Sequence, residues 1–119
     1  SEQKTLLNNF YNIAYKYDVE NINIDDTVAM SQELYNKEEI SLKEHMILSF
    51  DERNFRFGSA FITEPNAQNG YNLISEFKAR IGNNKKLGEE QNISNNTNVL
   101  DILMKLNALK SMKPLDIKV

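Results

Sequence analysis

Apolar residues recur at helical spacing along most of this chain, and this pattern restricts the fold more than any other feature. Residues three and four positions apart share one face of a helix, whereas alternate residues share one face of a strand. The helical spacing is present in residues 6–17, 24–35, 41–50, 65–81 and 98–113. It predicts an all-α domain with about five helices in a small orthogonal or bundle-like arrangement.

Start and stop signals sharpen two of these helices. Ser41 and Glu44 have the spacing of a capping box, in which each side chain accepts a hydrogen bond from the other residue's backbone N–H. Pro65 suits the first turn of the next helix, and Gly82 suits a left-handed cap at its end. The aromatic residues near 55–62 fit no helical pattern and predict a short extended stretch or a loop.

The spacing also suggests how the chain is divided. Residues 1–82 are expected to form a helical core with four helices, and the asparagine-rich residues 83–97 a long flexible loop. Residues 98–113 are then a C-terminal helix that completes the same domain or is exchanged with a partner. Pro114 ends it, and residues 114–119 are expected to be an extended tail.

Composition excludes several classes of protein. The 119 residues suit one domain, and they include no cysteine, so disulfide scaffolds and thiolate zinc sites are excluded. No stretch approaches the roughly 20 apolar residues of a membrane span, and no signal peptide is recognisable, so we expect a cytoplasmic protein without membrane insertion. Glycine-rich phosphate-binding motifs are absent, and the net charge is −3, so neither a nucleotide cofactor nor nucleic acid is an expected ligand. The abundance of asparagine and isoleucine is typical of an A/T-rich genome, bacterial or phage-like.

The only histidine, His45, would be the natural centre of a catalytic site. Ser41 and Ser49 lie one helical turn to either side of it, and three carboxylates are near in sequence, namely Glu44, Asp51 and Glu52. Ser41 is better explained as a helix cap, and no nucleophile motif or zinc-binding helix motif accompanies the histidine. We therefore expect no catalytic residues.

Residues 21–32 begin like the calcium-binding loop of an EF-hand. Asp26 occupies the position that requires glycine, and Gln32 occupies the position of the bidentate glutamate. Helix capping explains the same residues, so no metal site is expected.

The last predicted helix has more apolar surface than one stripe requires. It is either a central helix enclosed by the other four or a helix that also contacts a partner. The second interpretation predicts a partner-binding seam of four residues: Leu100, Leu103, Met104 and Leu106.

Charge is unevenly distributed. Residues 1–64 carry 6 basic and 12 acidic residues, whereas residues 65–119 carry 8 basic and 5 acidic residues. Such polarity would orient a partner during association. The residues expected to steer it are Glu38, Glu39, Glu44, Lys78, Arg80, Lys85 and Lys86.

Three functions remain open from the sequence. The leading one is a non-enzymatic, small helical interaction module (an adaptor, chaperone-like protein or regulatory subunit) that binds another protein or itself through the C-terminal helix. The second is an acidic inhibitor or immunity-type protein that masks a basic site, through Glu33, Glu38, Glu39, Glu44, Asp51 and Glu52. The third is an enzyme with a carboxylate site near His45.

Overall fold

The computed structural model describes residues 2–50 and 70–112, with side chains from residue 9 onward. Within these ranges the chain forms five helices and no strand, which confirms the all-α class. The helices are α1 (Glu2–Lys16), α2 (Ile24–Asn36), α3 (Leu42–Leu48), α4 (Leu73–Leu87) and α5 (Glu90–Lys110). None of them is long and apolar enough to cross a membrane. The residues expected to be extended, 55–62, lie outside the described ranges, as do 114–119.

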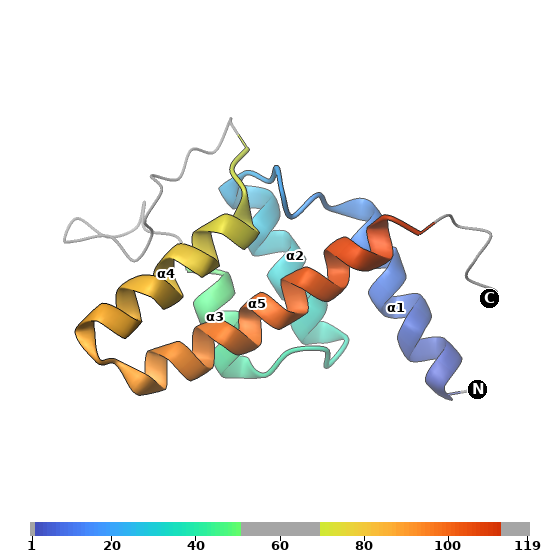
Figure 1. The fold of residues 1–119 in the computed structure, drawn as a ribbon. Coiled ribbons are helices and arrows are strands. Elements are labelled where there is room, and N and C mark those ends of the chain that lie inside the picture. Colours follow the sequence, from blue (N-terminus) through green and yellow to red (C-terminus); the bar gives the residue numbers. More distant parts are fainter. Residues whose placement is uncertain (1, 51–69, 113–119) are drawn as a thin grey trace.

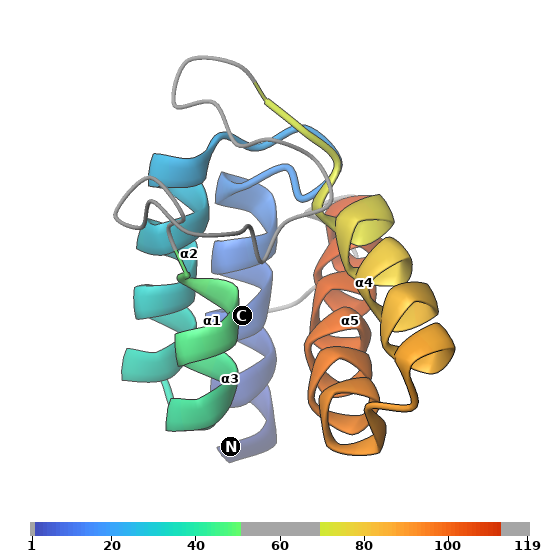
Figure 2. The ribbon, with the colours of Figure 1, turned by 90° about the vertical axis from the view of Figure 1, so that its left-hand side faces the viewer.

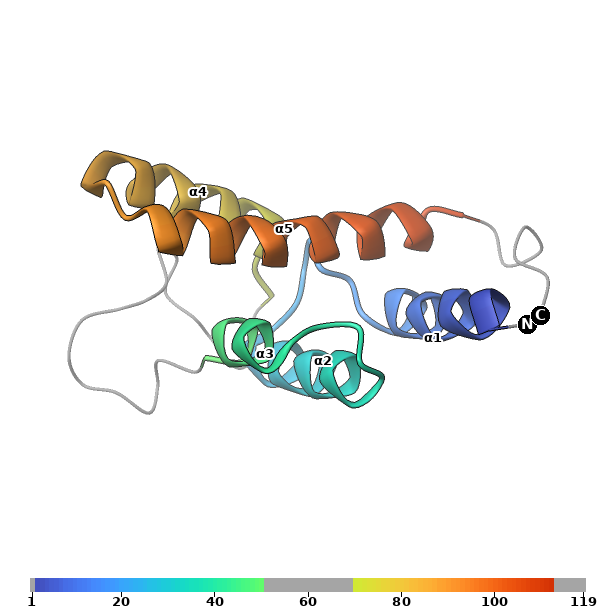
Figure 3. The same ribbon diagram turned by 90° about the horizontal axis from the view of Figure 1, so that it is seen from below.

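The helices form two layers (Figure 1, Figure 3). Helices α4 and α5 run antiparallel as a hairpin in one layer, and α1, α2 and α3 form the other. Figure 2 shows the hairpin standing beside the three-helix layer. Helix α5 packs against α1, α3 and α4, so it is the most central element. An isolated antiparallel bridge between Ile22 and Tyr71 joins the segments that precede α2 and α4, through two 3.0 Å hydrogen bonds.

The core lies between the two layers. Helix α5 contributes Val99, Leu103 and Leu106, whose spacing of four and three places them on one buried face. The other layer and α4 complete the core with Ile13, Ala14, Met30, Leu34, Leu48, Leu73 and Phe77.

The predicted capping box at the start of α3 is confirmed. The Ser41 side chain accepts a hydrogen bond from the Glu44 N–H at 3.1 Å, and the Glu44 carboxylate accepts one from the Ser41 N–H at 2.7 Å. Asn23 likewise caps α2 by accepting from the Asp26 N–H at 2.8 Å. Both caps satisfy backbone donors that the first helical turn leaves without partners.

The predicted loop over residues 83–97 is wrong. Helix α4 continues to Leu87, and α5 begins at Glu90. Gly88, with φ +68°, is the left-handed cap, whereas Gly82 lies inside α4. The expected boundaries of the C-terminal helix and of the four-helix core are corrected accordingly.

Packing across the hairpin explains the helical asparagines. The Asn96 amide donates to the Asn84 side-chain oxygen at 2.8 Å, and the Asn84 amide donates to the Glu89 carboxylate at 2.9 Å. Asparagine is a modest helix former, but tertiary packing supplies most of the stability of helices in proteins. Local composition therefore favoured a loop where contacts across the hairpin favour two helices.

The start of α4 also differs from the prediction. The helix begins at Leu73, and the Asn72 side chain caps it by accepting from the Ser75 N–H at 3.0 Å. Pro65, the predicted first-turn residue, lies outside the described ranges.

Candidate functional site

The predicted binding seam on α5 does not form one exposed surface. Leu103 and Leu106 are fully buried in the core, and Leu100 is half-buried against it. Met104, which is 48% exposed, is the only member on the surface. For Leu103 and Leu106 the structure supports the alternative of a central helix, because α5 is enclosed by helices on several sides. A binding role for Met104 stays a prediction.

The residues expected to steer a partner also differ in how exposed they are. Arg80 is buried and pairs with the buried carboxylate of Glu76 at 3.1 Å, while its guanidinium lies 4.4 Å from the Phe77 ring centre. It is therefore a nearly buried residue of the hairpin layer and not an exposed steering charge. Of the remaining steering residues, Glu39 and Glu44 are half-buried and four are exposed, namely Glu38, Lys78, Lys85 and Lys86.

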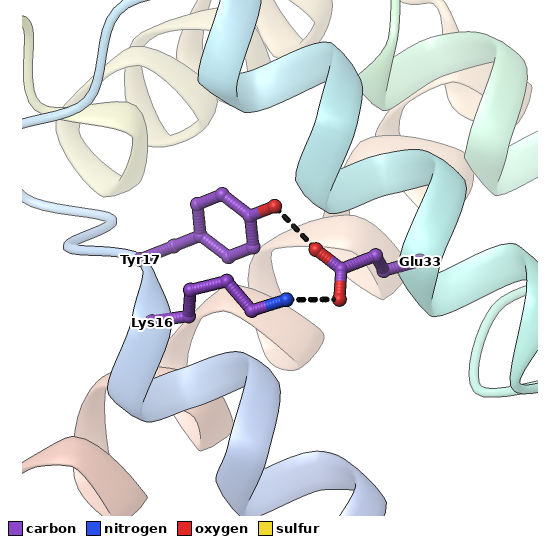
Figure 4. A network of polar contacts seen from close by, with 3 residues as sticks. All are labelled: Lys16, Tyr17 and Glu33. Atoms are coloured by element: carbon purple, nitrogen blue, oxygen red, sulfur yellow. Dashed lines mark hydrogen bonds and ion pairs between the residues drawn. The ribbon is translucent and has the colours of Figure 1, made fainter.

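The acidic set of the inhibitor hypothesis includes one residue with a clear internal role. The Glu33 carboxylate accepts hydrogen bonds from the Tyr17 hydroxyl and from the Lys16 ammonium, which is 2.6 Å away (Figure 4). Burial alone would raise the pKa of Glu33, but these two hydrogen bonds outweigh it and hold the pKa below its ordinary value. Burial and then the hydrogen bond to Glu33 raise the pKa of Tyr17 well above the ordinary range. The cluster joins α1 to α2, and Asp51 and Glu52 lie outside the described ranges.

His45 lies in a different cluster from the one expected. Its Nδ1 atom is hydrogen-bonded to the Ser31 hydroxyl at 2.7 Å, and its ring stacks on Tyr35 with centres 5.0 Å apart. Ser41 is occupied as the α3 cap, and the Ser49 hydroxyl donates to the His45 backbone oxygen at 2.6 Å. The sequence did not indicate Ser31, because it comes from α2. Ser31 is fully buried, so a substrate could not reach its hydroxyl. The hydrogen bond between Ser31 and His45 instead joins α2 to α3.

No metal centre is evident in residues 2–50 and 70–112. Within them no group of three or more histidine, aspartate or glutamate residues is placed to hold a metal ion.

Among the described residues, a groove lies between α3 and the tip of the α4–α5 hairpin. Its volume is about 660 Å³, within the usual range for ligand sites. Three helical segments line it: Lys43, Met46, Ile47 and Phe50 from α3 and its C-terminal end; Arg80, Asn83, Asn84 and Leu87 from α4; Glu89, Asn92, Asn95 and Asn96 from the start of α5. We call this feature the α3–hairpin groove.

The walls of the α3–hairpin groove differ in chemistry. The α3 wall is largely apolar, and the hairpin contributes Leu87 and a row of carboxamides. Met46 and Leu87 are 63% and 64% exposed, although both are large apolar side chains. Exposed apolar side chains that share one concavity are typical of binding surfaces.

The groove is also lined by two nearly buried carboxamides. Asn84 and Asn96 are only 8% and 9% exposed and are hydrogen-bonded to each other, as described above. Glu89 is held by the Asn84 amide. Lys43 forms no ion pair with any of the residues described in the structure. The groove therefore combines apolar anchors, carboxamides that can donate and accept, and one cation open to a partner.

The chain was compared with protein-family models, with curated proteins and with solved structures, and none of them matches. The function is therefore inferred from the α3–hairpin groove itself. The sequence contained one signal for it, the asparagines at positions 92, 95 and 96, whose spacing places them on one helical face. That signal could be read only once residues 90–97 were known to be helical.

Proposed function

We propose that this protein is a small, non-enzymatic helical interaction module that binds a segment of another protein in the α3–hairpin groove. The observation that carries the proposal is the placement of Met46 and Leu87 on different walls of one groove, each about two-thirds exposed. Covering such side chains with an apolar partner removes unfavourable contact with water. Adaptor, chaperone-like and regulatory roles all require a surface of this kind.

The expected affinity is moderate. Full burial of a large apolar side chain contributes about 1.5–3 kcal/mol, and Met46 and Leu87 are already partly covered. Association costs several kcal/mol in lost translational and rotational freedom, so two anchors leave only a modest surplus. These two anchors alone do not reach the about −8 kcal/mol of a micromolar dissociation constant, so we expect binding no tighter than micromolar.

The groove, and not the exposed part of α5, is the proposed contact surface. Binding at the groove and binding at the exposed part of α5 can be distinguished by experiment, because each of these two surfaces contains an exposed methionine. Met46 lines the groove, whereas Met104 lies on α5 away from it. Substituting each in turn by aspartate places a charge on one surface at a time while sparing the core.

The test uses displayed random peptides of about 16 residues, which span about 24 Å as a helix. Peptides are selected on the wild-type chain, and their affinities are then measured for Met46→Asp, Leu87→Asp and Met104→Asp. Leu42→Asp is the matched control on α3, because Leu42 is 56% exposed and does not line the groove. Thermal melts establish that each variant is folded.

We expect the selected peptides to lose at least about tenfold in affinity for Met46→Asp and Leu87→Asp, which corresponds to about 1.4 kcal/mol. Affinity for Leu42→Asp and Met104→Asp should be unchanged. Selection of no peptide, or of peptides that are insensitive to both groove substitutions, would refute the proposed function.

A further inference from the structure

Each wall of the α3–hairpin groove presents one face of a helix. Helix α3 and its end contribute positions 43, 46, 47 and 50; α4 contributes 80, 83, 84 and 87; and the α5 wall includes 89, 92 and 96. Positions three, four and seven apart form a single stripe along about two helical turns. Three such stripes directed at one space are the surroundings that a helix has inside a helical bundle.

We infer that the bound segment is an amphipathic α-helix with an acidic residue placed against Lys43, so that it fills the open position of a four-helix arrangement. This inference rests on the proposed function, and it specifies the class of partner.

The backbone chemistry of the walls favours a helix over an extended segment. A helix satisfies its own backbone hydrogen bonds and needs only side-chain contacts from its surroundings. An extended segment leaves its N–H and C=O groups to be paired, most readily by a sheet edge. The groove is walled by helices, whose interior backbone groups are already bonded within each helix, and offers no sheet edge among the described residues.

The two sides of the groove define the faces of the partner helix. Apolar residues of the partner would pack on Met46, Ile47 and Leu87, whereas polar residues would meet the carboxamides of Asn92 and Asn95. A carboxamide satisfies hydroxyl, amide or carboxylate partners equally well, so this side requires polarity and not one particular residue type.

Charge complementarity is the reason for expecting an acidic residue in the partner helix. Lys43 lines the groove and has no ion-pair partner in the described part of the chain, and Arg80 is paired with Glu76. The Glu89 carboxylate accepts from the Asn84 amide, keeps its negative charge and lies on a different wall from Lys43, so an acidic partner residue is favoured only at the α3 wall. The cation that is open to a partner is thus on the α3 wall. An exposed ion pair of this kind changes affinity about two- to fivefold.

The peptides selected for the proposed function also test this inference. They should be free of central proline, carry apolar residues at intervals of three and four, include aspartate or glutamate, and gain helicity on binding as measured by circular dichroism. Lys43→Glu should weaken their binding about two- to fivefold, and replacing the peptide's acidic residue by lysine should restore it. Lys78→Glu is the control, because Lys78 is exposed and does not line the groove.

The possible failures are distinguishable. Selected peptides that depend on Met46 but contain alternating apolar residues or central prolines would leave the proposed function standing and overturn the helix. A Lys43→Glu effect that no charge reversal in the peptide restores would overturn the acidic contact. Sedimentation that shows self-association sensitive to Met46→Asp would make a second copy of this chain the occupant and would also overturn the inference.

Discussion

The buried asparagine pair in the hairpin makes the strongest stability prediction. Asn96→Leu keeps a side chain of similar size and a better helix former, but removes the donor to the Asn84 oxygen. Asn84 then retains only its hydrogen bond to Glu89. A buried acceptor left without its partner costs about 1–3 kcal/mol, and improved helix propensity returns up to about 0.5 kcal/mol. We expect a net loss of about 1–2 kcal/mol.

The loss can be converted into a melting temperature. Unfolding entropy is about 2.1 cal/mol/K per residue, or about 250 cal/mol/K for the 119-residue chain, so Asn96→Leu should lower Tm by about 4–8 °C. The double variant Asn84→Leu, Asn96→Leu replaces both partners by apolar groups and should recover most of that loss. Denaturant titrations of both single variants and the double variant close the thermodynamic cycle. A single Asn96→Leu variant as stable as the wild type would refute the assigned role of the pair.

Three further predictions concern a turn and two carboxylates. Gly88→Ala should destabilise the chain by about 1–2 kcal/mol, because the φ of Gly88 is +68°. Gly82→Ala should stabilise it by up to about 1 kcal/mol, because Gly82 lies inside α4 and nothing lies within 4 Å of the added Cβ. Urea titration compares the two variants. The folded-state pKa of Glu33 is lowered, so the ionised carboxylate stabilises the folded chain above about pH 4.5, and this contribution is lost as pH falls. Glu33→Gln should therefore be less stable than wild type at pH 7 and should lose less stability on acidification. Thermal melts at several pH values measure both effects. Burial raises the pKa of Glu39 despite the nearby charge of Lys105, so its ionised form costs stability and Glu39→Gln should raise Tm at pH 7. That gain should shrink as pH falls toward about 4.5, the ordinary value, and be absent below it; a lower Tm at pH 7 would contradict this reasoning.

Much of the fold could be predicted because its signals are local. The capping box at Ser41 and the apolar stripe of α5 are properties of single segments, and both are present in the structure. The hairpin tip was mispredicted because the asparagines near Asn84 and Asn96 indicate a loop by composition, whereas their contacts lie 12 residues apart in sequence. Helix formation there depends on packing that no local window contains.

The candidate site was harder to predict for a related reason. Helix α5 is apolar on several sides because it contacts α1, α3 and α4, which accounts for Leu103 and Leu106, whereas a partner at the exposed Met104 stays a prediction. Met46 and Leu87, by contrast, each extend an ordinary apolar stripe and gave no separate signal. They become a candidate site only because the two layers place α3 beside the hairpin tip and leave both side chains exposed in one groove.

The polar side chains on the hairpin side of the groove explain why α3 and the hairpin do not close on each other. If both walls were apolar, the hairpin tip and α3 would gain free energy by closing on each other and expelling water. The carboxamides of Asn83 and Asn92 are instead exposed and can donate to and accept from water, so hydration on that side carries no comparable penalty. Because Met46 and Leu87 still face water, a partner that covers them while satisfying the carboxamides gains apolar burial without leaving polar groups unpaired. A purely apolar peptide would cover the carboxamides without forming hydrogen bonds to them. An asparagine-rich wall opposite an apolar one thus favours amphipathic partners over indiscriminate hydrophobic association.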